Sequence, residues 1–131
     1  MSKTKVPFET ATAEFEKWLN AKQVSKKRRE NLADMEEEII DAIMEGNLVL
    51  NKDIEFIQHL NFPNSKVSEL KFQTRIQVGM INAKLRGIQA NDVNGRLEAY
   101  ISALTGEPVS LVKTLDSSDF AIASCIATYF L

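Results

Sequence analysis

The chain has 131 residues, of which 44% are hydrophobic and 26% are charged, with a formal net charge of −2. A chain of this length forms one domain with a real hydrophobic core. Its mild acidity gives no general attraction to nucleic acid or to anionic membranes, and no apolar run approaches the roughly 18 residues that a membrane span needs.

The N-terminal part is predicted to be a charged helical region. Between about residues 9 and 45 there is no glycine or proline, and Ala, Glu, Lys and Leu are abundant. Phe15, Trp18 and Leu19 fall on one helical face, and a second apolar stripe runs through residues 32 to 43. The polar stretch between the two stripes is compatible with one long helix, or with two helices joined near Val24–Ser25.

A small sheet is expected next. In NLVLNKDIEFIQHL, Leu48 and Leu50 share one side, a short turn follows, and Ile54 and Phe56 again share a side, which predicts a β-hairpin. After a turn around Pro63, SELKFQTRI keeps a period of two as far as residue 76 and predicts a third strand. Such strands form an antiparallel sheet with one face covered.

After Gly79 the apolar period returns to that of a helix. MINAKLRGI predicts a short helix, NDVNGRLEAYISALTG a longer one before Gly106, and EPVSLVKTL a further short one. Asp116 is placed to cap the last helix, with Asp119 in its first turn. The expected fold is α+β, with helices flanking a small antiparallel sheet of about three strands. Residues 1–45 form its charged helical region and residues 46–131 its core domain, the two making one compact unit.

The run Lys26-Lys27-Arg28-Arg29 is the main cue for nucleic-acid binding. Affinity for nucleic acid needs cations along a continuous track. Here an acidic block from Glu30 to Glu45 follows directly, and no aromatic stacking platform is interleaved. The acidic block lies opposite the apolar stripe, so we expect it to face water. A bipolar helix of this kind could also pair with an antiparallel copy of itself.

No catalytic signature is present. His59 is the only histidine and Cys125 the only cysteine, so neither a nucleophilic triad nor a zinc site built from Cys and His alone can be assembled. None of the glycines belongs to a phosphate-binding loop. We therefore expect no enzymatic activity, no cofactor and no metal, and a core position for Cys125.

The last segment, LDSSDFAIASCIATYFL, is apolar around most of the circumference of a helix. Such a helix is buried on several sides. It is either a central core helix or a helix whose second side is offered to a partner. In the second case the expected contact residues are Phe120, Ile126, Tyr129, Phe130 and Leu131, with Phe15, Trp18 and Leu19 as a second patch.

The succession LEAYISALTGEPVSLVKTLDSSDFAIASCIATYFL resembles the C-terminal pattern of tail assembly chaperones from long-tailed phages and related contractile particles. In that pattern an ALTG helix end precedes a short helix, then L-D-x-x-D and an apolar helix ending on aromatic residues. Upstream, IIDAIMEGNLVLNKDIEFIQHLNFP and SELKF resemble the hairpin and the Pro-containing turn of such proteins. The resemblance covers about residues 39 to 131, and the N-terminal helical region departs from it.

The resemblance implies a non-enzymatic chaperone that binds the tape measure protein and keeps it soluble until the tail tube assembles. The expected partner is the tape measure protein or another tail protein, and we also expect a homo-oligomer. The start MSKTKVPFET lacks the apolar run of a secretory signal, which predicts a cytoplasmic location, in the host if the gene is a phage gene. The alternatives are a structural subunit of a tail or baseplate and, less favoured, a nucleic-acid-binding regulator that uses Lys26–Arg29.

Overall fold

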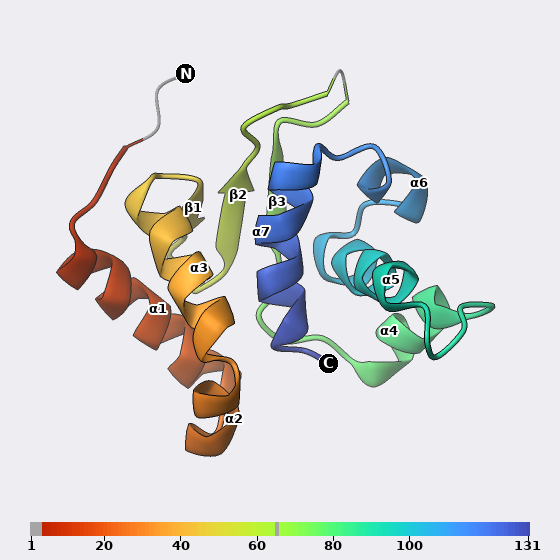
Figure 1. Ribbon diagram of the computed structural model, residues 1–131, viewed down its shortest axis with the longest axis horizontal. Coiled ribbons are helices and arrows are strands. Elements are labelled where there is room, and N and C mark those ends of the chain that lie inside the picture. Colours follow the sequence, from red (N-terminus) through yellow and green to blue (C-terminus); the bar gives the residue numbers. More distant parts are fainter. Residues whose placement is uncertain (1–3, 65) are drawn as a thin grey trace.

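Helices dominate the computed structural model, which describes residues 4–64 and 66–131. The elements in chain order are α1 (Phe8–Lys22), α2 (Lys26–Asn31), α3 (Ala33–Met44), β1 (Leu48–Leu50), β2 (Phe56–His59), β3 (Glu69–Phe72), α4 (Val78–Leu85), α5 (Val93–Thr105), α6 (Val109–Val112) and α7 (Ser117–Thr128). The helices flank a three-stranded antiparallel sheet, so the predicted α+β class is confirmed (Figure 1). None of the helices in the described part of the chain is long and apolar enough to cross a membrane.

Of the two alternatives that the sequence left open, the structure has the joint near Val24–Ser25, which separates α1 from α2. The helix α1 ends at Lys22, and its C-cap residue Gln23 has a left-handed φ of 64°. Ser25 then caps α2 by accepting a 3.2 Å hydrogen bond from the Arg28 backbone N–H. A second break at Leu32, which the sequence pattern did not predict, separates α2 from α3. These two breaks allow α1 to pack against α3.

The sheet has the strand order β1-β2-β3 and one covered face. Its register places Leu48 beside Gln58 and Gln58 beside Leu70, and all three side chains are buried. Val49 and Lys71 alternate with them and are exposed on the opposite face. The period of two therefore predicted correctly which side of these strands turns inwards. Ile54, which was expected in the second strand, lies before it with a left-handed φ of 60°.

The third strand is shorter than predicted and ends at Phe72. Its neighbour β2 begins at Phe56, the residue paired with Phe72, so no strand remains for residues beyond it. Instead the Gln73 backbone N–H donates to the Leu104 carbonyl at 3.0 Å, and the Thr74 hydroxyl donates to the Ile54 carbonyl. The alternating pattern continues to residue 76 because these side chains pack on other elements.

The helix α7 lies at the centre of the core, over the covered face of the sheet (Figure 1). It packs against α3 on one side and α5 on the other. Beside it, the Trp18 ring lies 5.2 Å from the Phe56 ring and 5.3 Å from the Tyr129 ring, measured between centroids. Residues from both predicted regions, 1–45 and 46–131, thus belong to one continuous hydrophobic cluster.

Candidate functional site

Most of the side chains predicted to contact a partner lie inside the fold. Those that are at most 4% exposed are Phe15, Trp18, Leu19, Ile126 and Tyr129. Phe120 and Phe130 are half-buried, and Leu131 is 48% exposed. The expected second patch on α1 is therefore core and not surface. In this conformation a partner can reach only the outer parts of Phe120, Phe130 and Leu131 among the expected contact residues.

The N-terminal helices provide the cover that the small sheet cannot supply. The helix α3 packs along α7, and α1 packs against α3. The Trp18 ring meets Tyr129 edge-on, and its centroid lies 6.3 Å from that of Phe130. A helix that is apolar nearly all round is in this way enclosed within one chain, so the core-helix alternative is the arrangement observed.

Basic side chains fasten the end of α7 to α1 and α2. The Arg28 guanidinium donates to the backbone oxygens of Thr128 at 3.0 Å and Leu131 at 2.7 Å. Lys22 places its ammonium nitrogen 3.9 Å from the centroid of the Phe130 ring, within cation–π range. Burial, followed by the charge of Arg28, lowers the pKa of Lys22. These cations therefore act within the fold.

Arg29 is also engaged internally. Its guanidinium makes two hydrogen bonds to the Glu36 carboxylate, at 2.9 and 3.1 Å, and lies 3.3 Å from Glu16. The hydrogen bond to Glu36 raises the pKa of Arg29. Within the described residues, only Lys26 and Lys27 of the basic run are exposed and make no ion pair. Two lysines do not form the continuous track that phosphate binding needs.

A groove opens between the start of α1 and the pair α2 and α3. It has a volume of about 480 Å³ and is lined by Phe8, Lys26, Arg29, Glu30, Ala33, Glu36, Glu37, Ile40 and Asp41. We name it the acidic groove, because carboxylates outnumber cations along its walls. Phe8 is 58% exposed and lies at the side of the groove, whereas Ile40 is buried and forms part of the floor of the groove. The groove therefore combines apolar contact with charged walls.

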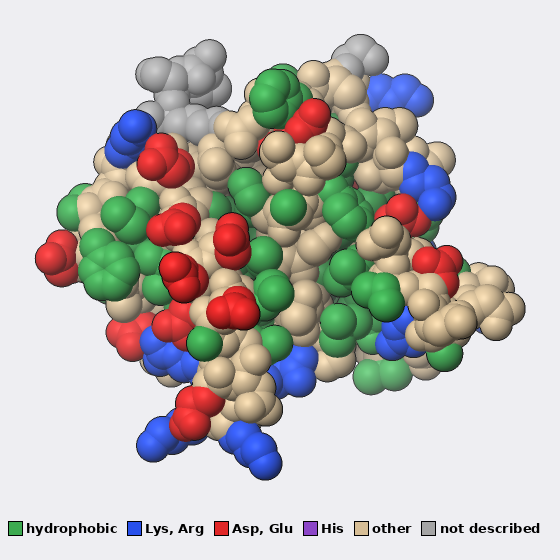
Figure 2. Space-filling model, in the orientation of Figure 1, with side chains coloured by type: hydrophobic (Ala, Val, Ile, Leu, Met, Phe, Trp, Pro, Cys, Tyr) green, Lys and Arg blue, Asp and Glu red, His purple; other side chains and the backbone are tan. Residues whose placement is uncertain are grey.

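The charge of the acidic groove is not neutralised by its own residues. Arg29 and Glu36 form an ion pair with each other. Glu30, Glu37 and Asp41 are exposed and make no ion pair within the described part of the chain. Figure 2 shows acidic side chains gathered over the surface of α3, as expected for a water-facing block. This face attracts cations.

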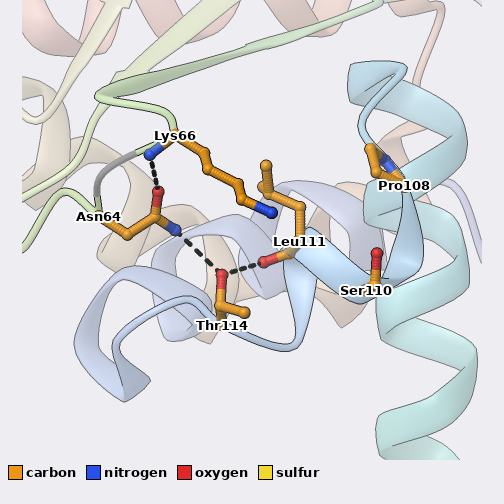
Figure 3. Close-up of a pocket in the computed structure, with 6 residues that line it drawn as sticks. All are labelled: Asn64, Lys66, Pro108, Ser110, Leu111 and Thr114. Atoms are coloured by element: carbon orange, nitrogen blue, oxygen red, sulfur yellow. Dashed lines mark hydrogen bonds between the residues drawn. The ribbon is translucent and has the colours of Figure 1, made fainter.

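A smaller hollow of about 240 Å³ lies between the β2–β3 loop and α6 (Figure 3). The Asn64 carboxamide donates to the Thr114 hydroxyl at 3.0 Å, and that hydroxyl donates to the Leu111 carbonyl at 2.6 Å. The Asn64 oxygen accepts from the Lys66 backbone N–H at 2.8 Å. These polar groups hold the loop against α6, so we assign the hollow a structural role.

The remaining groups of possible chemical interest are dispersed. In the described residues no three metal-binding side chains lie together. His59 is half-exposed, with Nδ1 3.7 Å from a Glu69 carboxylate oxygen on the open face of the sheet. Cys125 is buried in α7, as the sequence predicted.

We expect Cys125 to react slowly with alkylating reagents in the folded protein. Burial, with a smaller effect of the Glu38 charge, raises the pKa of its thiol to about 11. At pH 8 only about one thiol in a thousand is then ionised, and the thiolate is the reactive form. Iodoacetamide labelling followed by mass spectrometry should be slow at pH 8 and speed up with rising pH.

Unfolding in urea is the control, because it should restore ordinary thiol reactivity. As the pH rises, the thiol of the unfolded chain loses its proton before the thiol of the folded protein does. The contribution of Cys125 to the free energy of unfolding is therefore complete below pH 9 and is lost as the pH rises towards 11. Rapid labelling of the folded protein at pH 7 would contradict the buried position.

The sequence pattern located Asp119 but not its main contacts. Its side chain is 0% exposed, with one carboxylate oxygen accepting from the Asn61 N–H at 2.8 Å and the other from the Phe62 N–H at 3.0 Å. Gln58, also fully buried, donates from Nε2 to the Asp119 carbonyl at 2.9 Å. Asp119 thus holds the β2–β3 loop against α7 as well as occupying the first turn of that helix.

The acidic groove is the best candidate for a functional site, because it offers an exposed aromatic ring beside unpaired carboxylates. Phe8 was missed by the sequence analysis since it stands outside both apolar stripes of the N-terminal region.

No family model, no curated protein and no solved structure matches this chain.

Proposed function

We propose that the protein is a non-enzymatic assembly chaperone, which binds the tape measure protein and keeps it soluble while a phage tail or tail-like particle assembles. The pattern in residues 39 to 131 suggests this family. The observation that carries the proposal on the structural side is the acidic groove, where Phe8 and Ile40 lie among unpaired carboxylates. A chaperone must combine apolar contact with a surface that keeps its complex in solution, and this groove has both properties.

The client would bind outside the aromatic cluster of α7. Trp18 and Tyr129 are enclosed by the chain itself, so the groove replaces them as the proposed contact surface. The half-buried Phe130 and the exposed Leu131 remain as an outer contact. The expected homo-oligomer stays a prediction, and it would use a face other than the groove.

The test is co-expression with the longest helical, apolar-rich protein encoded beside the gene. We expect a partner that is insoluble alone to become soluble and to co-purify with this chain as a defined complex. An unrelated soluble domain of similar size is the control, because it should leave the partner insoluble. If the partner's solubility does not change and no complex forms, the chaperone proposal fails.

A structural subunit of the tail or baseplate is the alternative that the same experiment leaves standing. A subunit stays in the mature particle in fixed stoichiometry, whereas a chaperone is displaced before assembly ends. Quantitative mass spectrometry of purified particles separates the two functions. Stoichiometric recovery of this chain from particles would favour the subunit, and its absence there would favour the chaperone.

A further inference from the structure

We infer that the acidic groove binds a basic amphipathic helix, one that carries lysine or arginine beside a stripe of apolar side chains. The inference rests on the proposed function, because it specifies which part of a client protein would dock. The observations behind it are the lining and the charges of the groove, so an isolated helical peptide can test the docking separately from the chaperone function.

The charges of α2 and α3 select a basic partner. The exposed carboxylates on these two helices and at the C-cap of α3 are Glu30, Asp34, Glu37, Glu38, Asp41 and Glu45. Only Lys26 and Lys27 are exposed cations there. Among residues 4–64 and 66–131, the one ion pair to this set from elsewhere is Lys5 with Glu45 at 3.5 Å. Opposite charges across an interface speed association and reject partners of the wrong sign.

A second copy of the chain is a poorer occupant on the same grounds. Two copies facing each other across this surface would bring six exposed carboxylates against six others, with two lysines on each side. The pairing of lysines with carboxylates at the ends would be outweighed by repulsion along the middle. The bipolar pairing that the sequence suggested is therefore not favoured at this face.

The spacing of the wall residues fits a helix. Glu37 and Asp41 lie one turn apart on α3, so two basic residues one turn apart on a partner helix can face them together. An apolar side chain from the same partner face would then contact Phe8 and the floor at Ile40. Docking an amphipathic helix by a few such anchors is a common mode of peptide recognition.

The inference is tested with two fluorescent helical peptides that share one leucine stripe. One carries lysine on both flanks of the stripe and the other carries glutamate. Fluorescence anisotropy at low and at moderate salt should show that only the lysine peptide binds and that added salt weakens it. Equal binding of the glutamate peptide, or no binding of the lysine peptide, would overturn the inference.

Two matched charge reversals locate the site. The variant Glu37→Lys/Asp41→Lys changes the groove wall and should weaken binding about tenfold or more. The variant Asp34→Lys/Glu38→Lys makes the same charge change with the same spacing on α3, outside the lining of the groove, and should weaken binding less than about threefold. All four residues are exposed, and circular dichroism checks that both variants fold. Equal losses in the two variants would reduce the effect to overall charge and overturn the site.

Phe8→Ala tests the apolar part, since its ring is exposed and makes no described ring contact. It should weaken binding of the lysine peptide severalfold at a salt concentration that screens charge, and unchanged affinity would contradict the role of Phe8 as an apolar anchor.

Sedimentation of the free protein tests whether a second copy of the chain occupies the groove instead. A dimer that is lost in Glu37→Lys/Asp41→Lys would make the groove a self-interface and overturn the inference.

The co-expression experiment, repeated with Glu37→Lys/Asp41→Lys, separates this inference from the proposed function. If the reversed variant still keeps the client soluble, the chaperone function stands and the groove is not its site. If the lysine peptide binds the groove but no client is kept soluble by the native chain, the groove assignment stands and the chaperone proposal fails.

Discussion

Replacing Trp18 with alanine should lower the free energy of unfolding by about 3 to 5 kcal/mol, as expected for truncating a large core aromatic residue. The ring is 0% exposed and lies against Phe15, Phe56, Tyr129 and Phe130, with centroids 5.2 to 6.3 Å away. Because a domain of this kind is stable by only about 5 to 15 kcal/mol, the loss is a large share of the total. Urea unfolding followed by far-UV circular dichroism measures it, since the change removes the only tryptophan.

Trp18→Phe and Phe8→Ala are the matched comparisons. Phenylalanine keeps much of the ring contact and removes an indole N–H that is buried without a hydrogen bond, so its cost should be well below that of alanine. Phe8→Ala, at an exposed ring, should change stability by less than about 0.5 kcal/mol. A cost for Trp18→Ala as small as that of Phe8→Ala would place Trp18 on the surface, and would restore it as a contact residue.

Replacing Asp119 with alanine should lower the free energy of unfolding by about 2 to 4 kcal/mol. The substitution removes the acceptors of two backbone N–H groups in the β2–β3 loop, at Asn61 and Phe62. The substitution also removes a negative charge from the first turn of α7, where this charge interacts favourably with the helix dipole. Urea unfolding gives the loss, and hydrogen exchange should be faster at the amides of Asn61 and Phe62.

Asp116→Ala is the control for the effect on the helix alone. Asp116 caps α7 by accepting from the Ser118 N–H at 2.9 Å, and losing such a cap costs about 1 kcal/mol. Asp119→Asn should fall between the two alanine variants in stability, because it keeps one acceptor and points an NH₂ group at the other donor. If Asp119→Ala costs no more than Asp116→Ala, the buried carboxylate does not hold the loop.

The sequence predicted the local elements well because each has a signal within a few residues. The period of two around Leu48 and Phe56 identified the hairpin and its inward side, and Asp116 was correctly placed as the cap of the last helix. The choice between one and two helices at Val24–Ser25 stayed open. Ser25 is a sufficient cap, but a serine inside a long polar helix would look the same.

What the sequence could not show depends on which elements meet in space. Nothing local to Trp18 indicates that α3 and α7 pack beside it, so exposed and enclosed positions gave the same pattern. Asp119 contacts the loop after β2 at Asn61 and Phe62, which precede it in the sequence by 58 and 57 positions. The acidic groove depends on the unpredicted break at Leu32, which sets the angle between α2 and α3.

The contact between the N-terminal helices and α7 also has a consequence for synthesis. The Arg28 guanidinium donates a hydrogen bond to the carbonyl of Thr128, which lies 100 positions later. The Leu32 carbonyl accepts one from the hydroxyl of Tyr129, which lies 97 positions later. On the ribosome, the apolar faces of α1 and α3 therefore stay uncovered until α7 has been synthesised. At ordinary rates of translation, synthesis of the intervening residues takes roughly 5 to 20 seconds. Contacts of such long range also slow folding. A nascent chain of this protein thus displays apolar surface that its folded form conceals.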